Sequence, residues 1–212
     1  MTLPRIEPAL RGTRVIPVLV LDDPAQAVSI GRALVAGGLP VLEVTLRTPR
    51  ALACAEAIAA QVPGAIVGLG TLTRPEHFAQ ARDAGAKFTV SPGLTDRLAQ
   101  AALASGIPYL PGTATVTEAL IALEHGFSEL KFFPASVAGG APALRGMAPL
   151  LPDVRFCPTG GVRAEILRDY LSLSNVFAVG GTWLAPAEAV AQGRWDEIER
   201  LAREAAALAA AA

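Results

Sequence analysis

A lysine in the run ELKFFP (129–134) is the residue best suited to covalent chemistry in this sequence. Only two of the 18 lysine and arginine residues are lysines, Lys87 and Lys131. The alternation of a β-strand puts Lys131 on one face with Glu129 and Phe133, which predicts an inward-facing amine in apolar surroundings. Because desolvation disfavours the ammonium form and only a neutral amine attacks a carbonyl, such a lysine suits Schiff-base formation. A structural ion pair between Lys131 and a buried glutamate is the alternative.

A carboxylate and a guanidinium share one face of the run VLEVTLR (41–47). A period of two puts Glu43, Thr45 and Arg47 opposite the apolar residues of the same run. Buried charges are costly unless they are paired or solvated. We therefore expect Glu43 to serve as a base with Arg47 as an anion-binding cation beside it, or the two to form a structural ion pair. A cation beside Lys131 would further disfavour its ammonium form.

Two glycine pairs end the last two β-rich runs of the chain. Gly160 ends one run and Gly161 follows it, and Gly180 and Gly181 close the next run, with Thr182 immediately after. Glycines allow backbone N–H groups to approach phosphate oxygens closely, and the hydroxyl of Thr182 adds a donor. A tight turn explains one such pair, whereas two pairs in these positions predict a phosphate-binding site.

The elements that must position these residues alternate regularly along the chain. Ala/Leu-rich stretches that begin with Asp, Thr or Pro and end near Gly separate short β-rich runs, as helices separate strands. This alternation predicts a parallel sheet, and eight repeats of 20–25 residues predict a (β/α)8 TIM barrel. An open doubly wound sheet is the alternative, although no G-x-G-x-x-G motif opens the first helix. The eight runs span residues 14–20, 40–46, 65–70, 87–92, 107–112, 129–134, 154–160 and 175–181.

A barrel of this kind fixes where each residue type should lie. Residues 1–212 are expected to form a single domain, in which a short leading helix in segment 1–12 covers the amino-terminal end of the barrel. Chemistry belongs at the carboxyl ends of the strands, where Thr71 and Pro92-Gly93 follow two of the runs and leave a polar opening. Lys87 opens its run, so a stabilising role at the opposite end is expected.

Composition excludes several classes of function. A net charge of −1 provides no basic surface for nucleic acid or anionic lipid. The segment MTLPRIEPALRGTR (1–14) is too polar for a signal peptide, and no apolar run approaches the length of a membrane span. Cys54 and Cys157 are expected to be buried thiols in a reducing cytoplasm. His77 and His125 have no metal-ligand spacing, so no metal is expected.

Six segments together resemble a known family, the 2-keto-3-deoxy-6-phosphogluconate/4-hydroxy-2-oxoglutarate (KDPG/KHG) aldolases. GLPVLEVTLR (38–47) is similar to the family's active-site segment, and GFSELKFFPA (126–135) with Gly139 is similar to its Schiff-base segment. VGLGT, VSPGL, RFCPTGG and VGGTWL also match family motifs, in one order from about residue 14 to 205. Thr182 stands where a serine is common and Ser136 where an acidic residue is frequent.

The resemblance implies a role for each candidate residue. Lys131 would form the Schiff base, and Glu43 would act as general acid/base through a water. Arg47, Thr71 and the turn at Pro92-Gly93 would hold the pyruvate carboxylate, beside Phe133. The resemblance places the substrate phosphate at Gly160, Gly161, Gly180, Gly181 and Thr182.

The same resemblance implies a metal-free, cofactor-free class I aldolase, usually a homotrimeric barrel, acting on a small phosphorylated 2-keto acid in the cytoplasm. The expected reaction is the reversible cleavage of 2-keto-3-deoxy-6-phosphogluconate to pyruvate and glyceraldehyde 3-phosphate. The epimeric 6-phosphogalactonate derivative and 4-hydroxy-2-oxoglutarate are alternative substrates. A non-covalent phosphate-binding epimerase or transferase, or an inactive phosphosugar-binding barrel, would share the glycine loops. Neither gives a reason for Lys131.

Overall fold

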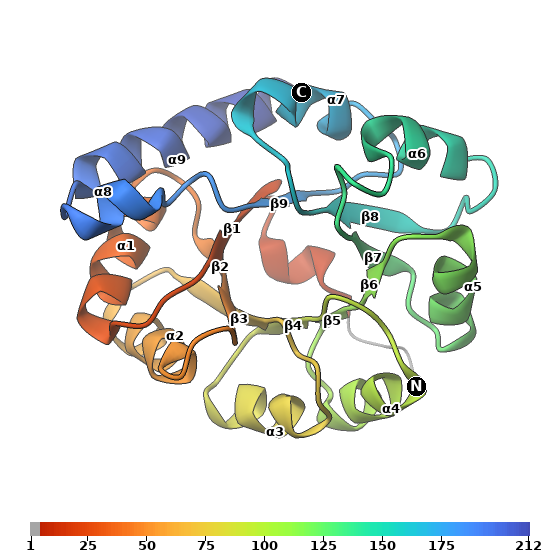
Figure 1. Cartoon of the computed structure of the whole chain (residues 1–212), viewed down its shortest axis with the longest axis horizontal. Coiled ribbons are helices and arrows are strands. Elements are labelled where there is room, and N and C mark those ends of the chain that lie inside the picture. Colours follow the sequence, from red (N-terminus) through yellow and green to blue (C-terminus); the bar gives the residue numbers. More distant parts are fainter. Residues whose placement is uncertain (1–4) are drawn as a thin grey trace.

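The computed structural model describes residues 5–212 and alternates strands with helices along the chain (Figure 1). The strands are β1 (Val15–Leu19), β2 (Val41–Thr45), β3 (Ile66–Gly70), β4 (Phe88–Val90), β5 (Tyr109–Leu110), β6 (Gly112–Thr113), β7 (Glu129–Phe132), β8 (Arg155–Pro158) and β9 (Val179–Gly181). The helices are α1 (Pro24–Ala36), α2 (Ala51–Gln61), α3 (Glu76–Asp83), α4 (Asp96–Ser105), α5 (Val116–Glu124), α6 (Gly140–Met147), α7 (Leu167–Leu171), α8 (Ala187–Ala191) and α9 (Trp195–Ala210). Two 3₁₀ helices, η1 (Glu7–Leu10) and η2 (Ala164–Ile166), complete this part of the chain.

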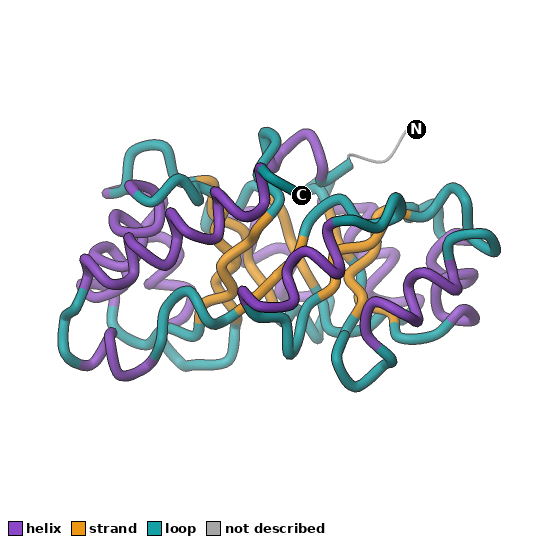
Figure 2. The backbone as a smooth tube through the Cα atoms, turned by 90° about the horizontal axis from the view of Figure 1, so that it is seen from above, coloured by secondary structure: helices purple, strands orange, loops and turns teal. Residues whose placement is uncertain are grey.

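The strands pair in parallel, which confirms the predicted α/β class. One sheet has the order β5-β4-β3-β2-β1-β9, and the other has the order β6-β7-β8. Isolated parallel bridges from Phe156 to Val176 and from Thr159 to Gly180 connect β8 with the segment that contains β9. The strands lie centrally, and the helices surround them (Figures 1 and 2).

The hydrogen bonds do not assign the single closed sheet of eight strands that the sequence predicted. The predicted strand 107–112 is divided at Pro111 into β5 and β6, because proline has no N–H to donate to a neighbouring strand. Its carbonyl still accepts a hydrogen bond from the Lys131 N–H, at 2.8 Å. The predicted strand 175–181 likewise contributes one bridge at Val176 before β9 begins.

Side-chain caps begin several helices where the sequence predicted helix starts. The Asp23 carboxylate accepts hydrogen bonds from two backbone N–H groups at the start of α1. Thr95 caps α4, and Thr115 forms a capping box with Glu118 at the start of α5. Each cap satisfies N–H groups that have no partner inside the helix. Each of these three helices therefore begins at a defined residue after the preceding strand.

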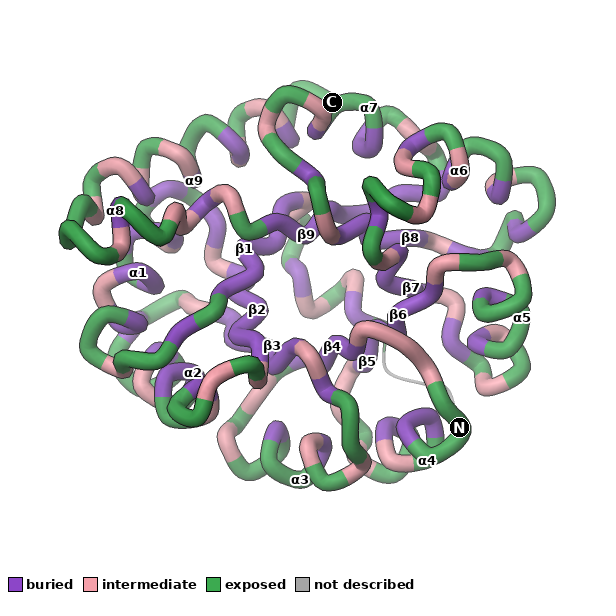
Figure 3. The backbone as a smooth tube through the Cα atoms, in the orientation of Figure 1, coloured by how far each residue is buried: buried purple, intermediate pink, exposed green. Residues whose placement is uncertain are grey.

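Two apolar clusters lie on opposite sides of the strands. The larger cluster packs the strands against the surrounding helices, and the smaller one fills the interior that the strands enclose. Burial is accordingly concentrated in the strands and on the inner sides of the helices (Figure 3). The inner cluster consists of Ile6, Leu10, Ile16, Val41, Ile66, Phe88, Val90, Leu110, Cys157, Phe177 and Ala178.

The amino-terminal segment closes one end of this interior. Helix η1 lies within the circle of strands in Figure 1, and Ile6 and Leu10 are buried in the inner cluster. The Glu129 carboxylate at the start of β7 accepts hydrogen bonds from the Ile6 and Glu7 N–H groups, at 2.6 and 3.2 Å, and from Arg5 Nε at 2.8 Å. The predicted leading helix is therefore a single 3₁₀ turn; residues 1–4 of the predicted segment lie outside the described residues.

Replacing Glu129 with alanine is expected to lower the free energy of unfolding by about 2 kcal/mol, because the buried Ile6 N–H loses its acceptor. The exposed Arg5 should contribute little of this loss. Urea unfolding gives the free energy, and limited proteolysis reports release of residues 5–11. The variant Glu124→Ala, on the exposed surface of α5, is the control. Equal stability and equal protease resistance for both variants would contradict this assignment.

Candidate active site

A lysine and a glutamate from opposite sides of the interior meet at the centre of the candidate site. Lys131 Nζ donates a hydrogen bond to Glu43 Oε1 at 3.2 Å, and the two side chains are 4% and 3% exposed. The Lys131 amine also lies 5.2 Å from the centre of the Phe133 ring. The period-two pattern thus correctly pointed both charged groups inward, and it brings them together although they are 88 positions apart in sequence.

A glycine on the neighbouring strand makes room for the Glu43 carboxylate. Gly70 ends β3, and a methyl group added to it would overlap the carboxylate of Glu43. Two residues earlier in β3, Gly68 pairs in register with Glu43, and a methyl group there would overlap the Phe88 ring. Packing against Gly70 therefore fixes the direction in which the Glu43 carboxylate points.

Lys131 has small or neutral neighbours on the adjacent strands. Its register partners are Gly112 in β6 and Cys157 in β8. Burial raises the pKa of the Cys157 thiol to about 12, so this group stays uncharged at neutral pH. Both Cys54 and Cys157 are free and buried, as the sequence predicted.

Arg47 does not extend the polar face of β2. The strand ends at Thr45, and Arg47 lies in the turn beyond it, exposed to solvent. Its Nε donates to Thr71 Oγ1 at 3.3 Å. Thr71 follows Gly70 directly and has a φ of 63°, a left-handed conformation that is uncommon for a residue other than glycine. Arg47 and Thr71 thus form a polar group at the carboxyl ends of β2 and β3.

Pro92 lies beside Gly112, the register partner of Lys131. It follows β4, and its carbonyl group packs so closely against Gly112 that a methyl group there would overlap it. Because Gly112 pairs with Lys131, the Pro92-Gly93 turn lies beside the strand that carries the amine.

The two predicted glycine pairs differ in their surroundings. Gly160 and Gly161 form a turn after β8 with φ values of 96° and 75°, and Gly160 packs on the Phe133 ring. Gly180 and Gly181 are buried residues of β9; a methyl group on Gly180 would overlap Thr159. Thr182 is exposed after β9 and lines a cavity of about 400 Å³ between the end of β1 and α8.

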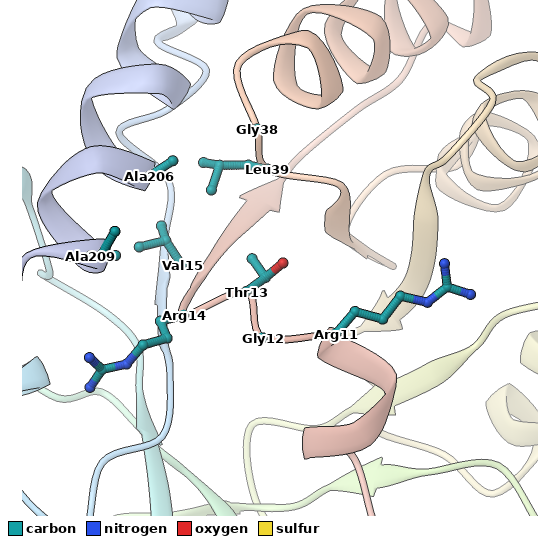
Figure 4. Close-up of a pocket in the computed structure, with 10 residues that line it drawn as sticks. Arg11, Gly12, Thr13, Arg14, Val15, Gly38, Leu39, Ala206 and Ala209 are labelled. Atoms are coloured by element: carbon teal, nitrogen blue, oxygen red, sulfur yellow. The ribbon is translucent and has the colours of Figure 1, made fainter.

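The opposite end of the strands contains a separate cavity. It has a volume of about 220 Å³ and lies among the start of β1, the loop before β2 and the last turns of α9 (Figure 4). Arg11 and Arg14 point away from one another there, and Arg14 donates to the Leu171 carbonyl at 2.7 Å. Lys87 precedes β4 at this same end, as predicted, and is exposed.

The sequence marks Gly70, Ser91 and Gly112 only as residues at the ends of β-rich runs, where an ordinary turn is the simplest interpretation. The contacts by which they support the site are not visible in one segment, because each of them crosses between strands. Ser91 and Tyr109 are buried and hydrogen-bonded behind the Pro92-Gly93 turn. Their only sequence signal was a position at or near the end of a β-rich run.

Among the described residues, no helix is long and apolar enough to span a bilayer, and no three His, Cys, Asp or Glu side chains form a metal-binding group.

The fold and the site together define an α/β protein that holds a buried lysine against a carboxylate at the centre of parallel strands, an arrangement suited to covalent catalysis by an amine. The family model for KDPG and KHG aldolases matches residues 6–201, and the chain therefore belongs to this family. The KHG/KDPG aldolase of Escherichia coli K12 is 49% identical over 191 residues, which are 90% of each chain. The 2-dehydro-3-deoxy-phosphogluconate aldolase of Dickeya dadantii is 48% identical, covering 97% of this chain and 96% of the relative.

Solved structures with known ligands are similar over nearly the whole chain. The 2-keto-3-deoxy-6-phosphogluconate aldolase of Zymomonas mobilis with 3-phosphoglycerate has 46% identity and a TM-score of 0.89, covering 96% of this chain and 95% of that one. The KDPG aldolase of Legionella pneumophila, with pyruvate captured as a covalent carbinolamine intermediate, has 40% identity and a TM-score of 0.92, covering 96% and 98%.

Proposed function

We propose that this protein is a class I aldolase that cleaves 2-keto-3-deoxy-6-phosphogluconate reversibly to pyruvate and glyceraldehyde 3-phosphate. The observation that carries the proposal is the buried contact of 3.2 Å between Lys131 Nζ and Glu43 Oε1. An amine and a carboxylate in contact can exchange a proton, which yields the neutral amine that attacks a ketone. Family membership, and a relative that captures pyruvate covalently, support the same chemistry.

The proposed reaction runs through an imine on Lys131. The neutral amine adds to the 2-keto carbon, and loss of water from the carbinolamine gives a protonated imine. Glu43, directly or through a water, removes the proton of the C4 hydroxyl group. The C3–C4 electron pair then moves into the imine as glyceraldehyde 3-phosphate leaves. Glu43 returns a proton to C3 of the enamine, and hydrolysis releases pyruvate and the free amine.

The remaining candidate residues are proposed to hold the two ends of the substrate. Arg47, Thr71 and the Pro92-Gly93 turn bind the carboxylate, while Phe133 packs along the carbon chain. The Arg47–Thr71 hydrogen bond, the packing of the turn against Gly112 beside Lys131 and the nearness of Phe133 to the amine support this role. The phosphate group binds at the loops after β8 and β9, through Gly160, Gly161, Gly180, Gly181 and Thr182. The similar Zymomonas mobilis aldolase holds a phosphorylated ligand, which supports a phosphate site.

The finer architecture is part of the same proposal. The bridges between β8 and the β9 segment, with β5 and β6 separated by Pro111 alone, support one (β/α)8 barrel that forms a single domain over residues 1–212. The family resemblance supports a cytoplasmic homotrimer that needs no metal or other cofactor. Sedimentation equilibrium of the purified protein measures the number of subunits directly.

The test of the proposed function is cleavage of the pure compound, with pyruvate detected through lactate dehydrogenase and NADH. We expect 2-keto-3-deoxy-6-phosphogluconate to be cleaved with a higher kcat/KM than its 6-phosphogalactonate epimer or 4-hydroxy-2-oxoglutarate. A preference for either of those compounds would move the assignment to that substrate within the same chemistry. No cleavage of any of them by folded protein would overturn the aldolase assignment and favour a non-covalent or inactive phosphosugar-binding barrel.

Replacing Gly70 with alanine is expected to lower kcat about 10-fold to 100-fold, because the added methyl group displaces the Glu43 carboxylate. KM should change by no more than about threefold, since the nearest atoms to the added methyl group all belong to Glu43 and not to the neighbouring Thr71 or the phosphate-binding loops. Gly146→Ala is the matched control, because nothing lies within 4 Å of the added carbon. A Gly70→Ala enzyme with wild-type kcat would show that Glu43 is not held by this contact.

A further inference from the structure

A chain of two hydrogen bonds connects a buried tyrosine to the Pro92-Gly93 turn. Tyr109 OH lies 2.5 Å from Ser91 Oγ, and Ser91 Oγ lies 2.7 Å from the Gly93 carbonyl oxygen. Ser91 is fully buried and Tyr109 is 4% exposed. These groups lie behind the strands, on the side that packs against the helices.

The direction of this chain follows from the chemistry of its last member. A carbonyl oxygen only accepts, so the single hydroxyl proton of Ser91 is donated to Gly93. Tyr109 must then donate to Ser91, because the serine has no second proton. Burial raises the pKa of the Tyr109 phenol above its ordinary value, so the phenol keeps its donor proton at neutral pH.

Aromatic packing fixes the start of the chain. The Tyr109 ring lies edge-on to Phe78 of α3 and to Phe127 before β7, with ring centres 5.1 and 5.3 Å apart. Both partner rings belong to the buried core between strands and helices. A ring enclosed in this way has little freedom to move, so its hydroxyl group is a fixed point from which Ser91 and Gly93 are held.

The inner side of the same turn rests on Gly112. A methyl group on Gly112 would overlap the Pro92 carbonyl group and lie 2.7 Å from the Gly93 nitrogen. Gly112 is the register partner of Lys131, and the Lys131 N–H donates to the Pro111 carbonyl at 2.8 Å. The Pro92-Gly93 peptide is therefore held from behind by Ser91 and supported on the inside by the strand next to Lys131.

We propose that Tyr109 and Ser91 are positioning residues. They hold the Pro92-Gly93 peptide in the position in which it binds the pyruvate carboxylate while Lys131 attacks the ketone. The inference rests on the proposed function, in which this turn is part of the carboxylate site. Neither side chain touches the substrate. Tyr109 acts through Ser91, and Ser91 acts through the backbone of the turn.

The test uses Tyr109→Phe, which removes the first hydrogen bond and retains the packed ring. Folded protein is incubated with increasing concentrations of pyruvate, reduced with borohydride and analysed by mass spectrometry. The measurement gives the pyruvate concentration at half-saturation and the maximal fraction of protein that carries the adduct. We expect the pyruvate concentration at half-saturation to rise about fivefold, with an unchanged maximal adduct. In the cleavage assay, KM should rise similarly while kcat stays within about twofold of wild type.

Tyr170→Phe is the matched control, because Tyr170 is equally buried but lies in α7, away from the turn. It should leave half-saturation unchanged. A lower melting temperature for Tyr109→Phe without a change in half-saturation would assign the hydroxyl group to stability alone and overturn the inference. Absence of an adduct in the wild type would instead overturn the proposed function, and with it this role.

A double-mutant cycle tests whether the two residues act in series. Ser91→Ala breaks the bond to the Gly93 carbonyl, so adding Tyr109→Phe should raise half-saturation no further than Ser91→Ala alone. If the double variant raised half-saturation by the product of the two single effects, the residues would act independently. That result would contradict a role in series through the hydrogen bonds from Tyr109 to Ser91 and from Ser91 to Gly93.

Discussion

Replacing Lys131 with methionine is expected to lower the rate of aldol cleavage by at least about 10⁴-fold and to abolish the borohydride-trapped pyruvate adduct. Methionine fills the space of the aliphatic chain but has no amine, so no imine can form. The Glu43 carboxylate would also lose the partner that lies 3.2 Å away, and part of the variant's folding stability should go with it. Thermal unfolding by circular dichroism establishes that the variant is folded before its activity is compared.

The chain provides its own control for this experiment, because Lys87 is its only other lysine. Lys87 precedes β4 at the opposite end of the strands and is exposed. Lys87→Met should retain both the adduct and wild-type activity, and digestion of the wild-type adduct should place the added mass on the peptide that contains residue 131. A pyruvate adduct in folded Lys131→Met would contradict the assignment of the nucleophile.

The alternation of strands and helices and the inward direction of Glu43 and Lys131 could be predicted from the sequence. Both depend on local periodicity: strand residues alternate between faces, and capping residues such as Asp23 and Thr115 start the helices. The position of Lys87 at the opposite end of the strands could also be predicted, because this lysine stands at the start of a β-rich run rather than late in one.

Features that depend on contacts between strands could not be predicted in this way. The room that Gly70 leaves for Glu43, and the close approach of Pro92 to Gly112, exist only in the register of neighbouring strands. The period of the run 41–47 predicts that Arg47 shares the inward face of Glu43, but β2 ends at Thr45. The chain turns there, with the Arg47 N–H donating to the Thr45 carbonyl. A period describes a strand only as far as the strand continues.

The buried pair also explains why charge is tolerated in the interior of this fold. Taking an ammonium and a carboxylate out of water is costly, and removing one partner leaves the other uncompensated. In this chain the partners are supplied by β2 and β7, and both carry function in the proposed reaction. The second buried carboxylate, Glu129 at the start of β7, is satisfied by backbone N–H groups and Arg5 at the far end of the strands. The two carboxylates therefore have separable tasks, one in the proposed reaction and one in closing the interior.

Replacing Glu43 with glutamine is expected to lower kcat by about 10² to 10⁴-fold, because the amide keeps the shape of the side chain but cannot accept a proton. The specific step at stake is proton transfer at C3 of the enamine. Incorporation of solvent deuterium into the methyl group of pyruvate, followed by proton NMR, measures that step without the aldehyde. Exchange should fall by a factor similar to that of kcat, while a pyruvate adduct on Lys131 still forms on prolonged incubation.

Glu129→Gln is the control, because it changes the other buried carboxylate, which lies on β7, and leaves Glu43 on β2 in place. It should weaken the amino-terminal closure and leave deuterium exchange within about twofold of wild type. If Glu43→Gln exchanged the methyl protons at the wild-type rate, the proton would have to move through another group. If both variants lost exchange equally, the loss would reflect the stability of the interior rather than the base. Only a selective loss in Glu43→Gln identifies this carboxylate as the group that moves the proton.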